Sequence, residues 1–240
     1  MSPVDQILAP SAPRRASRTA PAPHRRRLVT AFELLLLFFA NAVLVVGLWV
    51  RGGGLVVVGG STGALISAGR LTGLLGAYLV LVQLLLLARI PALERIVSFD
   101  RLTVWHRRNG RVALLLLLAH GILIAAGYAL RDRVGLPREV VLLMTTYPGV
   151  LAATVGLALL VAVVVTSIVI VRRKLRYERW YFIHLYSYLG IALAFSHQLD
   201  TGHDFVGNPA AQTYWKGLYV VTLAALVIFR VGIPLARAAY

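Results

Sequence analysis

The sequence predicts an all-α, polytopic membrane protein that folds as a six-helix bundle. Hydrophobic residues make up 59% of the 240 positions and charged residues only 14%, which is far from the balance of a soluble domain of this length. The apolar residues are gathered in six blocks, separated by arginine-rich or glycine-rich connections. Because the arginines behind the formal net charge of +16 lie between these blocks rather than on a polar surface, a nucleic-acid binder is excluded.

The chain divides into a polar tail and one transmembrane domain. Residues 1–27 are rich in Pro, Ala, Ser and Arg without apolar periodicity, so we expect a disordered, basic, cytoplasmic tail. Residues 28–240 form the domain, and each apolar block approaches the roughly 20 residues that a helix needs to cross a bilayer. The glycine-rich stretch 52–69 lacks the ending of a phosphate loop and is predicted to be a flexible connection, re-entrant in part. We predict helices at about 28–50, 71–90, 111–130, 150–171, 181–198 and 218–236.

The distribution of Lys and Arg predicts the orientation of these helices. The tail, the 89–111 and 172–179 connections and the C-terminal end together carry nineteen of them, whereas the alternate connections carry six. Positive charge is retained on the cytoplasmic side, so we expect a multi-pass protein of the plasma membrane with both termini in the cytoplasm. Residues 25–42 resemble a cleavable signal peptide in outline, but the apolar run continues to Val50, which favours a membrane helix.

Four histidines lie in or beside the predicted third and fifth helices. An ionisable side chain inside a bilayer is costly and normally has a partner or a function. His106 and His120 are fourteen residues apart, and His184 and His197 are thirteen apart, which corresponds to about 21 and 20 Å along a helix axis. Since both helices run outward, the histidines match in depth as an inner pair, His106 with His184, and an outer pair, His120 with His197.

Two matched histidine pairs are what two haems need. Each haem iron takes two axial imidazoles from opposite sides, so the spacing predicts two stacked, six-coordinate b-type haems between the third and fifth helices. The chain has no cysteine and only two methionines, which excludes iron–sulfur clusters and leaves bis-histidine ligation. A lone intramembrane histidine is as readily explained by a hydrogen bond between helices, and a haem-free transporter with histidine proton relays stays open as an alternative.

The fifth helix presents a geometric difficulty. At 100° per residue, fourteen residues return to within about 40° of one face, but thirteen fall about 140° away. We therefore expect either a distorted helix, with Gly190 easing the distortion, or haems approached from different sides of the helix.

The motifs around these histidines resemble the ferric reductase and NADPH oxidase transmembrane domain family. The segment from Trp105 to Gly110 contains His106 and is followed by His120. This segment and the two histidines are similar to the family's first histidine pair. The family's second histidine pair has similar counterparts in His184 and in Ser196-His197. The residues that lead to them, Arg172-Arg173 and Tyr177 to Tyr181, share the resemblance. The flanking segments 93–95, 100–102 and 147–149 look most like bacterial flavin-linked members. The resemblance covers roughly residues 28–238.

The resemblance implies a ferric reductase-type oxidoreductase that moves electrons across the membrane. Two haem b groups would take electrons from a cytoplasmic FAD- and NAD(P)H-binding module, which we expect outside this chain, on an in-frame continuation or on a partner subunit. The external acceptor would be a ferric chelate. Two alternatives remain open: an oxidase that reduces oxygen to superoxide, and a haem-bearing subunit that relays electrons to a partner reductase. In either case the protein contacts lipid and no nucleic acid.

Charged residues near the two faces are candidates for supporting roles. Arg107, Arg108 and Arg173 are candidates to pair with the propionates of the inner haem, although retention of positive charge at the cytoplasmic face explains them equally. On the outer side, one loop carries potential ferric ligands, and two arginines are candidates to attract an anionic chelate. The loop residues are Asp200, His203 and Asp204, and the arginines are Arg51 and Arg70.

Overall fold

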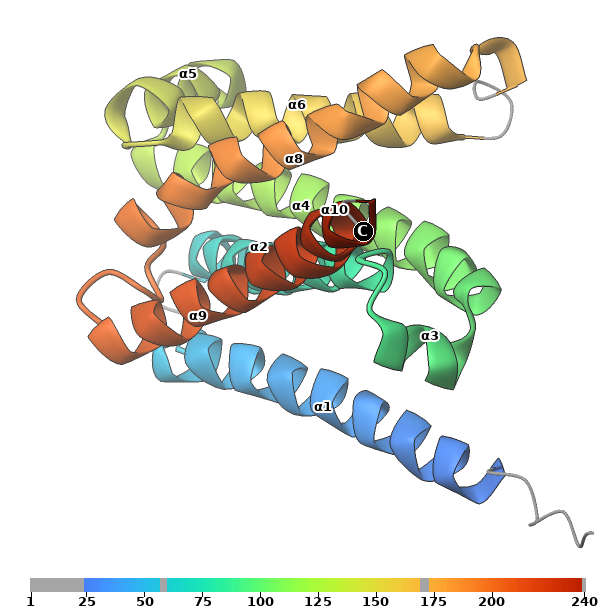
Figure 1. The fold of residues 1–240 in the computed structure, drawn as a ribbon. Helices are drawn as coiled ribbons and strands as arrows, with labels where there is room; N and C mark the ends of the chain where they lie inside the picture. The colour runs from blue at the N-terminus through green and yellow to red at the C-terminus, as the bar shows by residue number, and fades with distance from the viewer. Residues whose placement is uncertain (1–23, 57–59, 169–172, 239–240) are drawn as a thin grey trace, which may run out of the picture.

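The structure is a computed structural model that describes residues 24–56, 60–168 and 173–238, with side chains described from residue 31. Within these ranges helices are joined by turns and short connections without any strand, so the all-α prediction is confirmed. Figure 1 shows α5, α6 and α8 on one side of the bundle, α2 and α4 in the middle, and α1 on the opposite side. The elements are α1 (His24–Arg51), α2 (Ser61–Leu86), α3 (Pro91–Val97), α4 (Phe99–Asp132), α5 (Leu136–Thr146), α6 (Val150–Ser167), α8 (Tyr177–Asp200), α9 (Pro209–Leu226), the π-helical turn η2 (Val227–Gly232) and α10 (Ile233–Ala238).

Five helical segments are long and apolar enough to cross a membrane, which confirms a multi-pass membrane protein. They are Ala31–Arg51, Ser61–Leu86, Phe99–Asp132, Val150–Ser167 and Pro209–Ala238. The helix α8 is outside this set, although its 24 residues span about 36 Å. Glu178, Arg179 and Asp200 near its ends and His184 and His197 within it lower its apolar content. Length alone therefore makes α8 a candidate for the predicted sixth crossing.

Several predicted boundaries differ from those in the structure. The third predicted helix, 111–130, lies inside α4, which begins twelve residues earlier at Phe99 because arginines interrupt the hydropathy there without disfavouring a helix. His106 is therefore well inside a helix rather than at its start. Ser61 begins α2, so residues 61–69 are helical rather than a flexible connection. Residues 24–27 belong to α1, whereas residues 1–23 of the predicted tail and residues 169–171 of the fourth predicted helix lie outside the described residues.

Two short helices were not predicted from the apolar blocks. Both α3 and α5 carry a proline within their first two positions, Pro91 and Pro137, where the missing N–H costs no hydrogen bond. With seven and eleven residues, neither is long enough to cross a bilayer. Instead, α3 turns the chain from α2 into α4, and α5 leads from α4 into α6.

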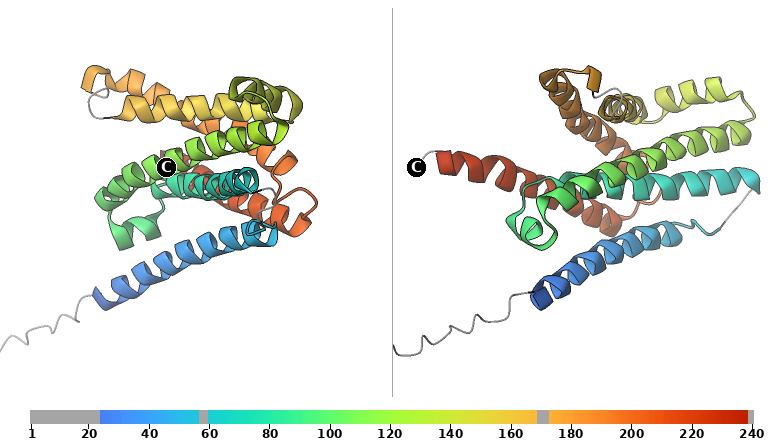
Figure 2. Two further views of the ribbon diagram at one scale, coloured as in Figure 1. Left: turned by 180° about the vertical axis from the view of Figure 1, so that it is seen from behind. Right: turned by 90° about the vertical axis from the view of Figure 1, so that its right-hand side faces the viewer.

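The bundle is built on two closely packed helix pairs, α2 with α4 and α6 with α8. Glycines allow the second pair to approach closely, because a Cβ on Gly156 would lie 2.5 Å from the Gly190 carbonyl oxygen. Small residues serve this purpose in membrane bundles, where backbones pack without a hydrophobic driving force. Figure 2 shows α1 on the far side of the bundle from α6 and α8. The four histidines lie between α4 and α8, as two separate pairs.

The helix α8 runs without a break from Tyr177 to Asp200, so any distortion of the predicted fifth helix does not interrupt it. Gly190 is buried in the contact with α6 rather than loosening the helix. Along a regular helix, side chains thirteen residues apart leave the axis about 140° apart. Both His184 and His197 nevertheless face a histidine of α4.

Candidate functional site

The four histidines form two facing pairs between α4 and α8. The ring centroids of His106 and His184 are 6.1 Å apart with planes at 45°, and those of His120 and His197 are 6.4 Å apart with planes at 40°. All four side chains are half-buried. The structure therefore brings together the two members of the inner pair and the two members of the outer pair. Along α4 the two histidines are fourteen residues apart, and along α8 they are thirteen apart.

The spacing of each pair can be compared with what an iron requires. An iron about 2 Å from one nitrogen of each imidazole, as in other imidazole–metal bonds, would hold the two ring centres about 6.3 Å apart. The observed distances of 6.1 and 6.4 Å are close to this value. Aromatic rings in direct contact also have centroids about 4.5–7 Å apart, so the distance agrees with an iron between the rings without requiring one. The donor set at each position thus fits a bis-histidine haem iron.

Backbone carbonyls orient the two histidines of α4. His106 Nδ1 lies 3.3 Å from the Gln83 carbonyl oxygen, and His120 Nδ1 lies 2.8 Å from the Gly69 carbonyl oxygen. An Nδ1–H that donates to a carbonyl leaves Nε2 with its lone pair, which is the usual arrangement of a metal-binding imidazole. Both carbonyls belong to α2, so this helix sets the orientation of the α4 ligands.

The two histidines of α8 have different surroundings. Ser167 Oγ donates to the Val163 carbonyl at 2.7 Å, so it is free to accept from His184 Nδ1, which lies 3.5 Å away. Trp180 packs on the His184 ring with centroids 5.1 Å apart. His197 Nδ1 is buried and has no hydrogen-bond partner of good geometry among the described residues. Buried polar atoms without a partner are rare in folded proteins, which marks His197 as an unusual position.

A cavity of about 700 Å³ lies beside the outer pair and is lined by both His120 and His197. This volume is within the range of about 300–1,000 Å³ for cofactor and ligand sites. Its wall is mainly apolar, with a few polar groups such as Arg131 and Tyr147. Gly73 also lines it, and a Cβ there would lie 2.5 Å from His120 Nδ1, so the absence of a side chain at this position makes room for the imidazole.

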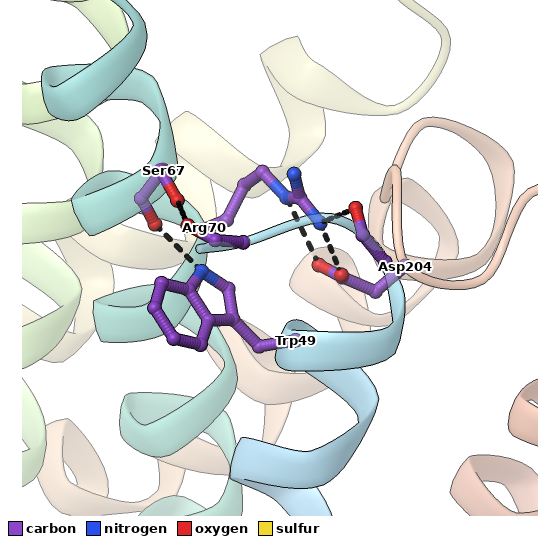
Figure 3. A network of polar contacts seen from close by, with 6 residues as sticks. Trp49, Ser67, Arg70 and Asp204 are labelled. Atoms are coloured by element: carbon purple, nitrogen blue, oxygen red, sulfur yellow. Dashed lines mark hydrogen bonds and ion pairs between the residues drawn. The ribbon is translucent and has the colours of Figure 1, made fainter. Parts of the chain in front are cut away.

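Two residues that line this cavity, Arg70 and Asp204, belong to the polar network drawn in Figure 3. Arg70 donates to both carboxylate oxygens of Asp204 and, at 2.8 Å, to the Gly52 carbonyl. Beside it, Trp49 Nε1 donates to the Ser67 carbonyl at 3.0 Å, and Ser67 Oγ donates to the Gly54 carbonyl at 2.5 Å. The network ties the α1–α2 connection to the loop after α8.

These contacts correct the expectations for the outer face. Asp204 is buried and paired, so it is not an exposed ferric ligand, and Arg70 is engaged with it rather than free to attract a chelate. Asp200, His203 and Arg51 are exposed. Among the described residues no group of three or more His, Asp or Glu side chains is arranged to hold a metal ion. The predicted ferric site in this loop therefore has no structural support, whereas a haem iron needs only two protein ligands.

The three arginines predicted to pair with propionates are exposed. Arg107 and Arg108 follow His106 on α4, and Arg173 lies at the start of the last described range. The site also includes features that sequence reasoning did not identify: the orienting carbonyls of Gln83 and Gly69, the space at Gly73, and Ser167. No local signal in the sequence distinguishes a carbonyl that orients an imidazole, because every residue has one.

The paired imidazoles lie within a multi-pass membrane bundle, and the comparison with known families assigns this bundle to a class of oxidoreductases. Residues 72–195 match the family described as the ferric reductase like transmembrane component, and the chain belongs to this family. The matched region contains three of the four histidines and ends two residues before His197. No curated protein matches the chain. Nor does any solved structure.

Proposed function

We propose that this chain conducts electrons across the membrane through two bis-histidine b-type haems. His106 and His184 hold the inner haem, and His120 and His197 hold the outer haem. The two facing imidazole pairs, with centroids 6.1 and 6.4 Å apart, carry the proposal. When bound, the haems supply one-electron chemistry, and the chain supplies ligands, orientation and an apolar enclosure.

The residues of the chain determine which kind of acceptor reaction is open. Two imidazoles on each iron leave no free coordination position, so the acceptor is reduced without binding to the iron. The carbonyls of Gln83 and Gly69 hold two of the imidazoles in place, which limits reorganisation when an electron arrives. The wall of the outer cavity is mainly apolar, which would lower the polarity around a haem bound at the second site.

The proposal extends to topology and to partners. We place α8 as the sixth crossing helix and both termini on the cytoplasmic side of the plasma membrane, on the distribution of Lys and Arg. A flavin and NAD(P)H module, on a continuation or a partner outside this chain, donates electrons at the inner haem. Ferric iron in a soluble chelate is the proposed acceptor, and Arg107, Arg108 and Arg173 remain proposed partners of the inner propionates.

The experiment is a haem count on the purified full chain, expressed with ample haem. We expect two haems per chain and a low-spin b-type absorption spectrum. The double variant His120→Ala, His197→Ala is expected to retain one haem. His24→Ala is the control, because this histidine precedes the first membrane-spanning segment, Ala31–Arg51, and it is expected to retain two haems. A colourless protein would point to a transporter instead, and an unchanged haem count in the double variant would overturn the ligand assignment.

A further inference from the structure

Arg230 lies in the last membrane-spanning segment, Pro209–Ala238, at a place where the helix is not regular. Residues Val227–Gly232 form the π-helical turn η2, and the Ile233 N–H bonds to the Ile228 carbonyl. Arg230 is exposed and lies eight residues before the end of this segment, and a charged side chain within a membrane segment is a candidate functional position by default. Arg230 has a defined partner, because its Nη1 donates to the Leu87 carbonyl at 2.8 Å.

The sequence accounts for the wide turn at this position. Pro234 has no N–H, and in a regular helix its ring would collide with the carbonyl of the residue four positions earlier, which is Arg230. Widening the turn relieves this collision, and single π-helical turns are frequent at functional sites. The irregular turn therefore directs Arg230 toward the end of α2 as a consequence of Pro234.

The end of α2 holds both Arg230 and an inner-pair ligand. The Gln83 carbonyl contacts His106 Nδ1 at 3.3 Å, and the Leu87 carbonyl, one turn further along the chain, accepts from Arg230. One helical turn corresponds to about 5.4 Å, so the guanidinium lies within roughly 12 Å of the His106 ring.

A cation at this distance affects electron transfer through electrostatics. Reduction of a ferric haem to the ferrous form adds one negative charge, and a nearby positive charge stabilises the reduced form. The side chain of Arg230 is exposed at the protein surface, so its charge is screened more than that of a buried group. The outer pair lies about 20 Å further along α4 and α8, so a charge at Arg230 acts mainly on the inner site.

We propose that Arg230, tethered to the Leu87 carbonyl by the π-helical turn, is a positioning residue that raises the reduction potential of the inner haem and so favours acceptance of an electron from the donor. The inference rests on the proposed function, since it requires a haem between His106 and His184. It differs from the predicted propionate contacts, because it assigns the effect to a residue of the last membrane segment.

The test is a potentiometric titration of the purified haem protein, followed through its absorption spectrum. Arg230→Gln removes the charge and keeps a hydrogen-bond donor. We expect it to lower the inner potential by the equivalent of about tenfold in the one-electron equilibrium, or about 59 mV, with the outer potential unchanged. Arg230→Lys keeps the charge and is expected to restore most of the potential.

Controls separate this effect from general ones. Arg237→Gln removes a charge from α10, seven residues further along the chain, and is expected to leave both potentials unchanged. Titration of Arg230→Gln in the His120→Ala, His197→Ala background identifies the shifted haem as the inner one. Unchanged potentials, or equal shifts of both haems, overturn the inference while the haem count upholds the proposed function. Absence of haem from the unsubstituted chain overturns both.

Discussion

Gly73→Ala is expected to weaken the outer haem site selectively. The added Cβ would lie 2.5 Å from His120 Nδ1 and 2.9 Å from Cε1, about 1 Å closer than the usual contact of 3.5–4.0 Å. The imidazole has to retreat by about this distance, which breaks its 2.8 Å hydrogen bond to the Gly69 carbonyl. The substitution therefore disturbs both the place and the orientation of one proposed ligand.

The magnitude follows from two contributions. Overpacking of a well-filled site costs about 1–3 kcal/mol, and the lost hydrogen bond costs about 0.5–1.5 kcal/mol. Because each 1.4 kcal/mol is about a factor of ten, we expect the outer haem to bind on the order of 10- to 1,000-fold more weakly. The inner pair has no contact with Gly73 and is expected to keep its haem.

The assay is transfer of haem from the purified protein to an excess of a haem-scavenging apoprotein. One of the two haems is expected to leave the Gly73→Ala variant faster than it leaves the unsubstituted chain. Gly217→Ala is the matched control, since a Cβ at this helical glycine meets no atom within 4 Å. Equal rates of loss in the two variants would refute the reasoning about the place of His120.

Three further outcomes are expected. Asp204→Asn leaves the largely buried Arg70 guanidinium without its carboxylate partner and is expected to lower the free energy of unfolding by about 3–5 kcal/mol. Thermal unfolding in detergent measures this loss. The control Asp200→Asn, at an exposed position, is expected to change the stability little. Gly156→Val is expected to push α6 from α8 at the Gly190 carbonyl and to change both haem spectra, and unaltered spectra would contradict the close packing of these helices. With reduced protein, a ferric chelate is expected to accept electrons faster than oxygen does, and predominant superoxide formation would favour the oxidase alternative.

The histidine pairs illustrate what the sequence predicts well. The cost of an imidazole in a bilayer and the helical rise of 1.5 Å per residue are local quantities, so spacing alone predicts which histidines share a depth. The structure brings His106 to His184 and His120 to His197. The spacing left the course of α8 open, because it does not specify from which side of a helix a partner approaches.

Hydropathy blocks predict the apolar centres of the helices rather than their ends. The first three turns of α4 carry arginines, which helices accept readily, so the helix extends beyond its apolar block to Phe99. Both α3 and α5 are shorter than a membrane span and therefore produce no apolar block of the required length. The same limitation hid the helical start of α2 at Ser61.

The sequence by itself determined the membrane class, the two histidine-bearing helices and the two depths of their histidines, because composition and helical periodicity act over short stretches of chain. Only the tertiary structure decided which groups surround the histidines. Arg70 and Asp204 are 134 residues apart, and Arg230 and Leu87 are 143 apart. Such contacts depend on how helices cross, and crossing is set by close packing at positions such as Gly156 and Gly190. A local pattern contains no information on it.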